Sequence, residues 1–438
     1  MKTRVRYGRG GLEVELPDRN VAAVLRLNPV PPIEAPKRAV ADALRWPISS
    51  PALLNLARGR QSACVVISDI TRPVPNKDIL APLLRALEEA GLSRGDVTIL
   101  IGTGLHRPNE GDELLEMLGR ELLDDYRVVN HLGRDVESHA DLGRTRPRPE
   151  LGLRGTPVQL DRRYVEADLK VAVSLIEPHL MAGYSGGRKA ICPGIASVNT
   201  IRVFHGPQLM EPEESRAGLL DGNPCHEESL AIAGKCPPDF IVNVTLDERR
   251  RITGIFAGHW IEAWLAGAAH CERAARATLP EPVDVVVTTN AGYPLDLTFY
   301  QAVKGIIQAT PIVKRGGTVI IAAECAEGVG GPEFTELILG VEDLEAFVRR
   351  TYEPDFFAID QWQMHMLARA RRKVDVYCLA DGIPREVLDR LFVSPIESVE
   401  HGVELALRKH GRDAMIAVIP EGPYVLPEVD GSRNNAGA

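Results

Sequence analysis

Short runs rich in valine and isoleucine alternate along the chain with longer segments of helical periodicity, and this alternation limits the fold more than any other feature. In the first half the apolar runs end near residues 69, 102 and 176 ("ACVVISD", "DVTILIG" and "DLKVAVSLI"), and each precedes a helix-like segment. Such runs are typical of strands buried on both faces of a parallel sheet, with helices as crossover connections. We therefore expect an α/β protein with mostly parallel sheets.

A second series of the same kind starts at "PVDVVVTTN" (282–290) and continues to "AMIAVIP" (414–420), with one long helical segment over 344–372. The two series are separated by a helical stretch that ends in Pro-Glu-Pro near residue 282. A chain of 438 residues also exceeds what one hydrophobic core usually supports. We predict two α/β domains, followed by a loose polar tail: 1–275, 283–425 and 426–438. The first 16 residues read as a hairpin around "GRGG".

Composition excludes several classes of function. The formal net charge is −9, with no long block of lysine or arginine, which argues against nucleic acid or an anionic membrane as a partner. The apolar runs are too short to cross a bilayer and no signal peptide is evident, so we expect a cytoplasmic protein. Seven cysteines without C-x-x-C spacing indicate buried reduced thiols, not a disulfide framework or a zinc knuckle.

Chemically versatile residues follow several of the predicted strands. In open α/β sheets ligands collect at the carboxyl ends of strands. Each residue also has an ordinary structural interpretation: an arginine paired with an acid near a helix start, a loop histidine, a solvated helix face, or aromatic core packing. The candidates at strand ends are Asp69, Thr71, Arg72, His106 and His179 in the first series and Gln301 and Lys304 in the second, with Tyr300 and Trp362 as aromatic neighbours.

The segment "GYSGGRKA" (183–190) concentrates glycine and positive charge directly after a predicted strand. Glycines at such a place let backbone N–H groups approach a phosphate, although a purely structural turn explains them equally well. The spacing matches neither a P-loop nor G-x-G-x-x-G. No H-x-x-x-H pair occurs, so no single segment supplies a complete metal site.

Four separated motifs together resemble one family. "SDITRPVPN", "GTGLHRP", "EPHLMAGYSGGRKAICPGIASVNTIRVFHGP" and "YQAVKG", in this order, are similar to lactate racemase and its homologues, the nickel-pincer-nucleotide racemases and epimerases of 2-hydroxy acids. The resemblance spans nearly the whole chain. It implies an isomerase whose cofactor is a pyridinium mononucleotide with two thio-acid arms, tethered through a thioamide to Lys189. One histidine, His205, would complete the nickel coordination, which suits the square-planar geometry of nickel(II).

The resemblance also assigns roles to the candidates at the strand ends. His106 and His179 correspond to the two catalytic acid/bases, and both domains contribute, so the active site is expected in the cleft between them. The other assignments are Asp69, Thr71, Gly186 and Gly187 near the cofactor, Arg72, Gln301 and Lys304 on the substrate carboxylate, and Met181, Tyr300 and Trp362 on the pocket wall. The expected partners are a small 2-hydroxy acid and the enzymes that make the cofactor.

Two alternatives stay open from the sequence. The apolar pocket residues favour a lactate-like substrate, but malate, 2-hydroxyglutarate, phenyllactate and an aldonic acid are alternatives. A second rival is a protein that binds nickel or the nucleotide without turnover. Two candidate bases beside a carboxylate-binding arginine favour the enzyme.

Overall fold

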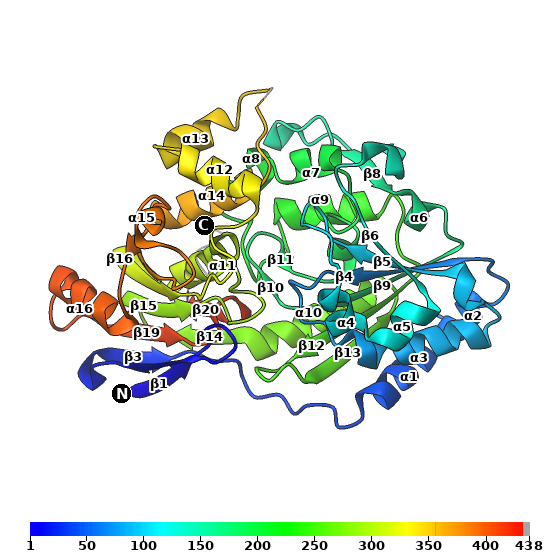
Figure 1. Cartoon of the computed structure of the whole chain (residues 1–438), viewed down its shortest axis with the longest axis horizontal. Coiled ribbons are helices and arrows are strands. Elements are labelled where there is room, and N and C mark those ends of the chain that lie inside the picture. Colours follow the sequence, from blue (N-terminus) through cyan, green and yellow to red (C-terminus); the bar gives the residue numbers. More distant parts are fainter. Residues whose placement is uncertain (355, 432–438) are drawn as a thin grey trace. The chain divides into compact units, whose positions relative to one another are not determined.

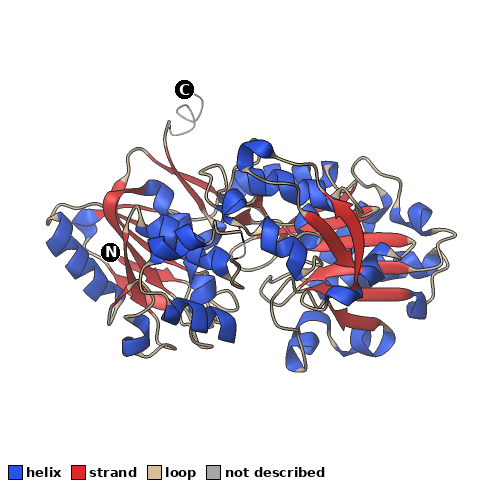
Figure 2. Ribbon diagram, turned by 90° about the horizontal axis from the view of Figure 1, so that it is seen from above, coloured by secondary structure: helices blue, strands red, loops and turns tan. Residues whose placement is uncertain are grey.

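The computed structural model describes residues 1–354 and 356–431, which form two compact units. The central unit is one continuous stretch, Pro29–Arg273. The terminal unit combines Met1–Asn28 with the chain from Ala274 onward. The second crossing between the units lies beside the predicted boundary, but the first was not predicted from the sequence. Figure 2 shows the strands of both units in red, with helices packed around them.

The central unit is built on a six-stranded sheet that is parallel except for its edge strand β13. In spatial order the strands are β13 (Ile252–Gly258), β12 (Phe240–Leu246), β9 (Leu169–Leu175), β4 (Ala63–Ser68), β5 (Val97–Gly102) and β6 (Arg127–Asn130). Its helices are α1 (Pro36–Arg45), α2 (Leu53–Ala57), α3 (Asn76–Glu89), α4 (Asp112–Leu118), α5 (Arg120–Asp125), α6 (Arg162–Val165), α7 (Val198–Phe204), α8 (Pro207–Met210), α9 (Pro224–Ala233) and α10 (Glu262–Ala275).

Burial on both faces explains why the strands of this sheet are nearly continuous apolar runs. Alternate residues of β4, such as Val65 and Ile67, join a core with Leu80, Leu83 and Leu87 of α3. Figure 1 shows α1 and α3 on one side of the strands and α7 and α9 on the other. The sequence pattern therefore predicted these strands correctly, because a strand covered twice carries no polar alternation.

The terminal unit contains a fully parallel six-stranded sheet. Its spatial order is β18 (Ser394–Pro395), β17 (Asp375–Leu379), β16 (Val313–Ala322), β15 (Val283–Thr289), β19 (Ile416–Ile419) and β3 (Val21–Val24). The helices are α11 (Phe299–Ala309), α12 (Pro332–Gly340), α13 (Leu344–Arg350), α14 (Gln361–Arg371), α15 (Arg385–Leu388) and α16 (Val399–His410). Four two-stranded sheets complete the fold: β1 (Lys2–Val5) with β2 (Leu12–Glu15), β7 (His139–Arg144) with β8 (Pro157–Asp161), β10 (Pro178–His179) with β11 (Gly183–Tyr184), and β14 (Arg276–Leu279) with β20 (Leu426–Val429).

Three sequence predictions need correction. Residues 1–28 do not join the N-terminal domain predicted for 1–275, because β3 pairs in parallel with β19 and so extends the other sheet. The segment 344–372 is two helices, α13 and α14, separated near Pro354, whose ring cannot continue a helix, and by Asp360, which has a left-handed backbone with φ of 65°. Leu426–Val429 is a strand, not loose tail, and residues 432–438 lie outside the described residues.

The N-terminal hairpin and the free thiols agree with the expectations from the sequence. The N-terminal hairpin is β1 and β2, paired from Lys2 with Glu15 to Val5 with Leu12. All seven cysteines are free, and all but Cys236 are buried. No helix in the described part of the chain is long and apolar enough to cross a membrane.

Candidate active site

Apart from His205, which follows α7, the candidate residues of the central unit lie on three loops at one edge of its sheet. Strand β4 lies between β5 and β9, and all three run parallel. Their carboxyl ends therefore meet at the same edge, and the loops that leave them are neighbours. Asp69, Thr71 and Arg72 follow β4, His106 follows β5, and His179 follows β9. The strand order thus brings together residues that are more than 100 positions apart.

Asp69 holds His106 by a direct hydrogen bond. The Nδ1 atom of His106 lies 2.7 Å from Oδ2 of Asp69, while the Thr71 hydroxyl donates to Oδ1 of the same carboxylate at 2.6 Å. Burial alone would raise the pKa of Asp69, but the charge of His106 and the two hydrogen bonds lower it below its usual value. A charged carboxylate on Nδ1 fixes the proton of a neutral imidazole there, so Nε2 is the ring atom that accepts protons.

Arg72 forms an ion pair with a residue that the sequence analysis did not single out. Its Nη1 lies 2.6 Å from Oε1 of Glu177, and the two side chains are 19% and 7% exposed. The arginine belongs to the same turn as the Asp69 carboxylate, because its backbone N–H donates to the Asp69 carbonyl at 3.1 Å. The structural interpretation of Arg72, an arginine paired with an acid, is therefore confirmed, and its role on the substrate stays a prediction. A signal was present in the sequence, since Glu177 directly follows a buried strand in the motif "EPH".

His179 lies on a small hairpin formed by β10 and β11. His179 pairs with Gly183 across this hairpin and is buried. The backbone N–H groups of Met181 and Ala182 approach its Nδ1 at 3.4 Å each. Met181 is buried, and its carbonyl accepts a hydrogen bond from Asn223 at 3.0 Å.

The glycine segment after the hairpin is a tight turn packed against Trp264. Gly186 and Gly187 have φ values of 75° and 52°, and a Cβ added to Gly187 would lie 2.6 Å from Cγ of Trp264. The Gly187 N–H donates to Oδ1 of Asn243 at 2.8 Å. The turn leads into the short 3₁₀ helix Gly187–Ala190. These contacts give both glycines a structural reason, and a contact with phosphate at this turn stays a prediction.

Arg188 is buried and stabilises this turn through its guanidinium. Its guanidinium donates to the carbonyls of Tyr184 at 3.0 Å and Ala182 at 2.6 Å, and it stacks 4.0 Å from the Trp264 ring. Burial lowers the pKa of Arg188 to about 9. This role could not be predicted from the sequence, because a buried arginine has no distinctive spacing.

Lys189 and His205 lie on either side of Phe204. The Lys189 Nζ atom is 5.6 Å from the centre of the Phe204 ring, which is 5.0 Å from the centre of the His205 ring. Burial of the amine, reinforced by the charge of Arg188, lowers the pKa of Lys189 to about 7, although the residue as a whole is only partly buried. Burial, followed by the charges of Lys189 and His106, holds the pKa of His205 well below its usual value. His205 follows α7 directly, as the C-cap of that helix. Lys189, His205 and His106 thus belong to one electrostatic cluster.

The remaining candidates belong to the terminal unit. Gln301 and Lys304 lie on α11; Gln301 is buried, and its Oε1 has no hydrogen-bond partner among the described residues. Tyr300 accepts a hydrogen bond at its hydroxyl from the Trp362 indole at 2.8 Å, so these two aromatic residues do lie together. The cleft predicted between the domains, and the meeting of these residues with the histidines, stay predictions.

The histidines to which the sequence analysis gave no role have structural partners. Each one is fixed by a hydrogen bond or a ring contact within its own unit: His131 with Asp161 at 3.0 Å, His226 stacked on Trp264 at 5.4 Å, His259 accepting from the Glu262 N–H at 3.4 Å, and His365 with Thr351 at 3.0 Å. Within residues 1–354 and 356–431, no group of three or more His, Cys, Asp or Glu side chains is placed to hold a metal ion.

Comparison with family models decides the relationship. The model of the lactate racemase N-terminal domain matches residues 7–218, and that of the lactate racemase C-terminal domain matches residues 279–426. The chain belongs to the lactate racemase family. This result confirms the family and the isomerase class predicted from the motifs.

Individual members of the lactate racemase family support the same conclusion. The lactate racemase of Thermoanaerobacterium thermosaccharolyticum is 34% identical over 96% of this chain and 97% of its own length. That of Lactiplantibacillus plantarum is 32% identical over 89% of this chain and 90% of its own. The apoprotein structure of the Thermoanaerobacterium enzyme superimposes with a TM-score of 0.89 at 33% identity, covering 98% and 100% of the two chains, which confirms the α/β fold. A Thermotoga maritima protein shares the fold at 19% identity with a TM-score of 0.69, covering 90% of this chain and 98% of its own.

Membership in the lactate racemase family implies a nickel-dependent enzyme, and the residues present fit such a group. The chain itself offers no three-ligand metal site among its described residues, so most ligands would have to come from a bound cofactor. His205 supplies one buried imidazole, and Lys189, a partly buried residue, supplies an amine in the same cluster.

Proposed function

We propose that this protein racemises a lactate-like 2-hydroxy carboxylic acid, using His106 and His179 as the two acid/bases. One observation carries the proposal. The turn after β4 contacts the loops of both candidate bases. Its Asp69 binds His106, and its Arg72 pairs with Glu177 on the loop that carries His179. A protein that only stored a cofactor would need neither arrangement.

The proposed cofactor is a nickel-pincer nucleotide attached to Lys189, with His205 as the protein ligand of nickel. When bound, this group would supply a hydride acceptor and donor. Asp69, Thr71, Gly186 and Gly187 are proposed to lie beside it. The support from the structure is that Lys189 and His205 both lie beside the Phe204 ring, at 5.6 Å from Nζ and 5.0 Å between ring centres.

The chemistry of the substrate explains why two histidines are needed. The α-hydrogen of a 2-hydroxy carboxylate is a poor acid, because the adjacent carboxylate resists a second negative charge. Oxidation to the planar 2-keto acid avoids this, provided that a base removes the hydroxyl proton. The two antipodes present their hydroxyl groups on different sides, so each needs its own base. His106 is suited to this role through Nε2, because Asp69 occupies Nδ1.

Arg72 is proposed to bind the substrate carboxylate with a charge-assisted hydrogen bond that keeps the keto acid in the site between the two half-reactions. Gln301 and Lys304 of α11 are proposed as further carboxylate ligands. Met181, Tyr300 and Trp362 are proposed to surround the substrate side chain. Because these three are mainly apolar, short aliphatic or aromatic substrates are favoured over dicarboxylates.

The proposal is tested with holoenzyme made alongside the cofactor-synthesising enzymes, since the apoprotein should be inactive. Turnover of D-lactate, D-malate and D-phenyllactate is followed by chiral chromatography. We expect D-lactate or D-phenyllactate to be racemised fastest. Absence of turnover with every 2-hydroxy acid, in protein that carries nickel, would instead support the storage role.

The roles of the two bases are tested by substitution. His106→Ala and His179→Ala should each abolish racemisation in both directions, because every turnover uses one base for each antipode. Loss should reach about 100-fold or more, the usual contribution of a general base. His259→Asn is the matched control: it follows β13, which is antiparallel to β12, so it lies at the opposite edge of the sheet. Full activity in either alanine variant would remove that histidine from the mechanism.

A further inference from the structure

Glu177 has no role in the proposed reaction, yet its carboxylate contacts the arginine that is proposed to bind substrate. The Oε1 to Nη1 distance is 2.6 Å, and both partners are largely shielded from water. We infer that Glu177 is a positioning residue, which fixes the guanidinium of Arg72 so that the substrate carboxylate is held in register with the two histidines. This inference rests on the proposed function.

The backbone of Glu177 is firmly anchored, so its carboxylate can hold the Arg72 guanidinium in one place. The Glu177 N–H donates to the Ser185 hydroxyl at 3.0 Å, and the Ser185 N–H donates to the Glu177 carbonyl at 2.9 Å. Ser185 is fixed in turn, because its hydroxyl donates to the Leu175 carbonyl at 2.8 Å and its own carbonyl accepts from the Trp264 indole at 2.8 Å. These hydrogen bonds join the two ends of the hairpin that carries His179.

The pair therefore connects two loops that are separate in the sequence. Arg72 shares a turn with Asp69, which holds His106, while Glu177 stands two residues before His179. A guanidinium has five N–H donors in a planar fork. Glu177 contacts Nη1, and a fork with five donors can engage a second carboxylate as well. An arginine held from one side in this way loses little freedom when a ligand binds at the other.

The rival explanation is a purely structural ion pair. Such a pair can specify the packing of two loops even where replacing it is neutral for stability. The two explanations differ in what they predict for catalysis. A positioning residue affects the rate at which correctly bound substrate reacts, whereas a structural pair affects the amount of folded, loaded protein.

The test compares Glu177→Ala and Glu177→Gln holoenzymes with the wild type, using lactate in both directions. Cofactor loading is measured by intact mass and folding by thermal denaturation. We expect Glu177→Ala to lower kcat about 10- to 100-fold, since a displacement near 1 Å can cost about 100-fold. KM should stay within about 3-fold, because Arg72 keeps its charge and loses a competing carboxylate. Glu177→Gln keeps an oxygen that accepts from Nη1 and should restore kcat to within about 5-fold of wild type.

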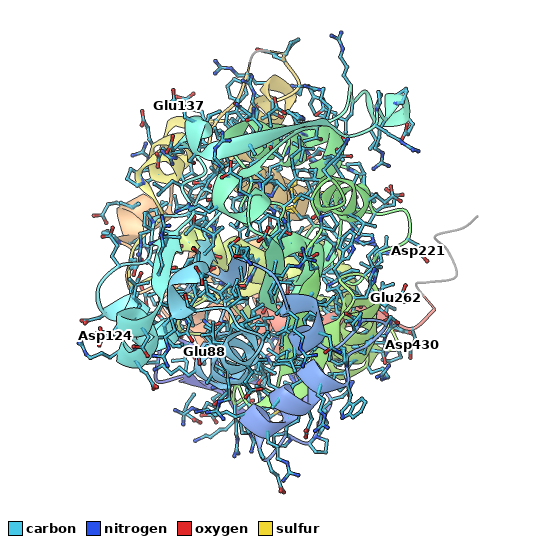
Figure 3. The ribbon with its side chains drawn as sticks, turned by 90° about the vertical axis from the view of Figure 1, so that its right-hand side faces the viewer. Glu88, Asp124, Glu137, Asp221, Glu262 and Asp430 are labelled. Atoms are coloured by element: carbon cyan, nitrogen blue, oxygen red, sulfur yellow. The ribbon has the colours of Figure 1, made fainter. Side chains whose placement is uncertain are left out.

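Two controls isolate the effect. Glu88→Gln removes the same charge from a glutamate at the end of α3 that pairs with Arg94 at 2.7 Å and is labelled in Figure 3; it should leave kcat and KM unchanged. In an Arg72→Ala background, adding Glu177→Ala should change kcat/KM by less than about 2-fold, because residues that act through one another are not additive.

Three results would overturn the inference: a rise in KM with unchanged kcat, a loss explained entirely by reduced loading or folding, or full additivity with Arg72→Ala. Inactive wild-type holoenzyme would instead refute the proposed function, and with it this inference. The two failures are distinguishable because the second leaves no active reference enzyme.

Discussion

Replacing Gly187 with alanine tests whether the turn before Lys189 is as rigid as its contacts indicate. The residue has φ of 52°, and the new Cβ would lie 2.6 Å from Cγ and 2.7 Å from Cδ1 of Trp264. Trp264 has little room to move. Its indole donates to the Ser185 carbonyl at 2.8 Å, and its ring is stacked with the Arg188 guanidinium at 4.0 Å and the His226 ring at 5.4 Å.

The expected loss of stability has two parts. A left-handed backbone costs a residue with a Cβ about 1–2 kcal/mol. Forcing an extra methyl group into a packed contact costs about 1–3 kcal/mol more. Together they reduce the free energy of unfolding by about 2–5 kcal/mol. For a unit of this size each 1 kcal/mol lowers Tm by about 2–4 °C, so the expected decrease is about 4–20 °C.

Gly152→Ala is the matched control. Gly152 lies in the same unit with φ of 69°, and a Cβ there would meet no atom within 4 Å. Gly152→Ala should therefore lose only the backbone part of the stability, about 1–2 kcal/mol, which lowers Tm by about 2–8 °C. Calorimetry of the apoprotein measures both shifts, with the transition of the central unit followed separately because two units need not unfold together. Equal shifts in the two variants would refute the steric argument.

Three further predictions concern single side chains. Lys189→Ala should eliminate the covalent adduct, seen as a missing mass increment on the intact chain; an unchanged adduct would exclude Lys189 as the point of attachment. His205→Ala should lower bound nickel, measured by metal analysis, while the adduct mass stays. His226 has its pKa lowered to about 3 by burial and by the charge of Arg188. Below a pH of about 6.5 the unfolded chain binds this proton and the folded chain does not, so the stability that His226 contributes is complete above about pH 6.5 and decreases towards pH 3. His226→Phe should reduce the difference in Tm between pH 7 and pH 4.5; an unchanged difference would show that other groups cause it.

The sequence predicted the strands and helices well where burial is symmetric, and less well where pairing is remote. The runs that became β4, β5 and β9 are apolar because both faces of the sheet are covered. Strand β3 is only four residues long, and its partner β19 lies almost 400 positions away. Nothing in local periodicity indicates such a pairing, so residues 1–28 were assigned to the wrong unit.

The candidate site shows the same division. The positions of Asp69, His106 and His179 at strand ends could be predicted, because a polar residue directly after a buried strand is visible in the sequence. The ion pair between Arg72 and Glu177 could not, because it depends on β4 and β9 being neighbours and on the path of two loops. Strand order is a property of the whole sheet, and charge type alone does not say which acid meets which base.

The position of β4 between β5 and β9 has a mechanistic consequence. The turn that follows β4 carries two opposite charges three residues apart, and each contacts a different neighbouring loop. Asp69 binds His106, and Arg72 binds Glu177 on the loop of His179. Because the Arg72 N–H is bonded to the Asp69 carbonyl, both proposed bases are positioned relative to one backbone turn. A racemase must treat two mirror-image substrates alike, which requires that its two bases keep a fixed relation to the group that holds the carboxylate. Under the proposed mechanism, a turn anchored on both sides would provide that relation.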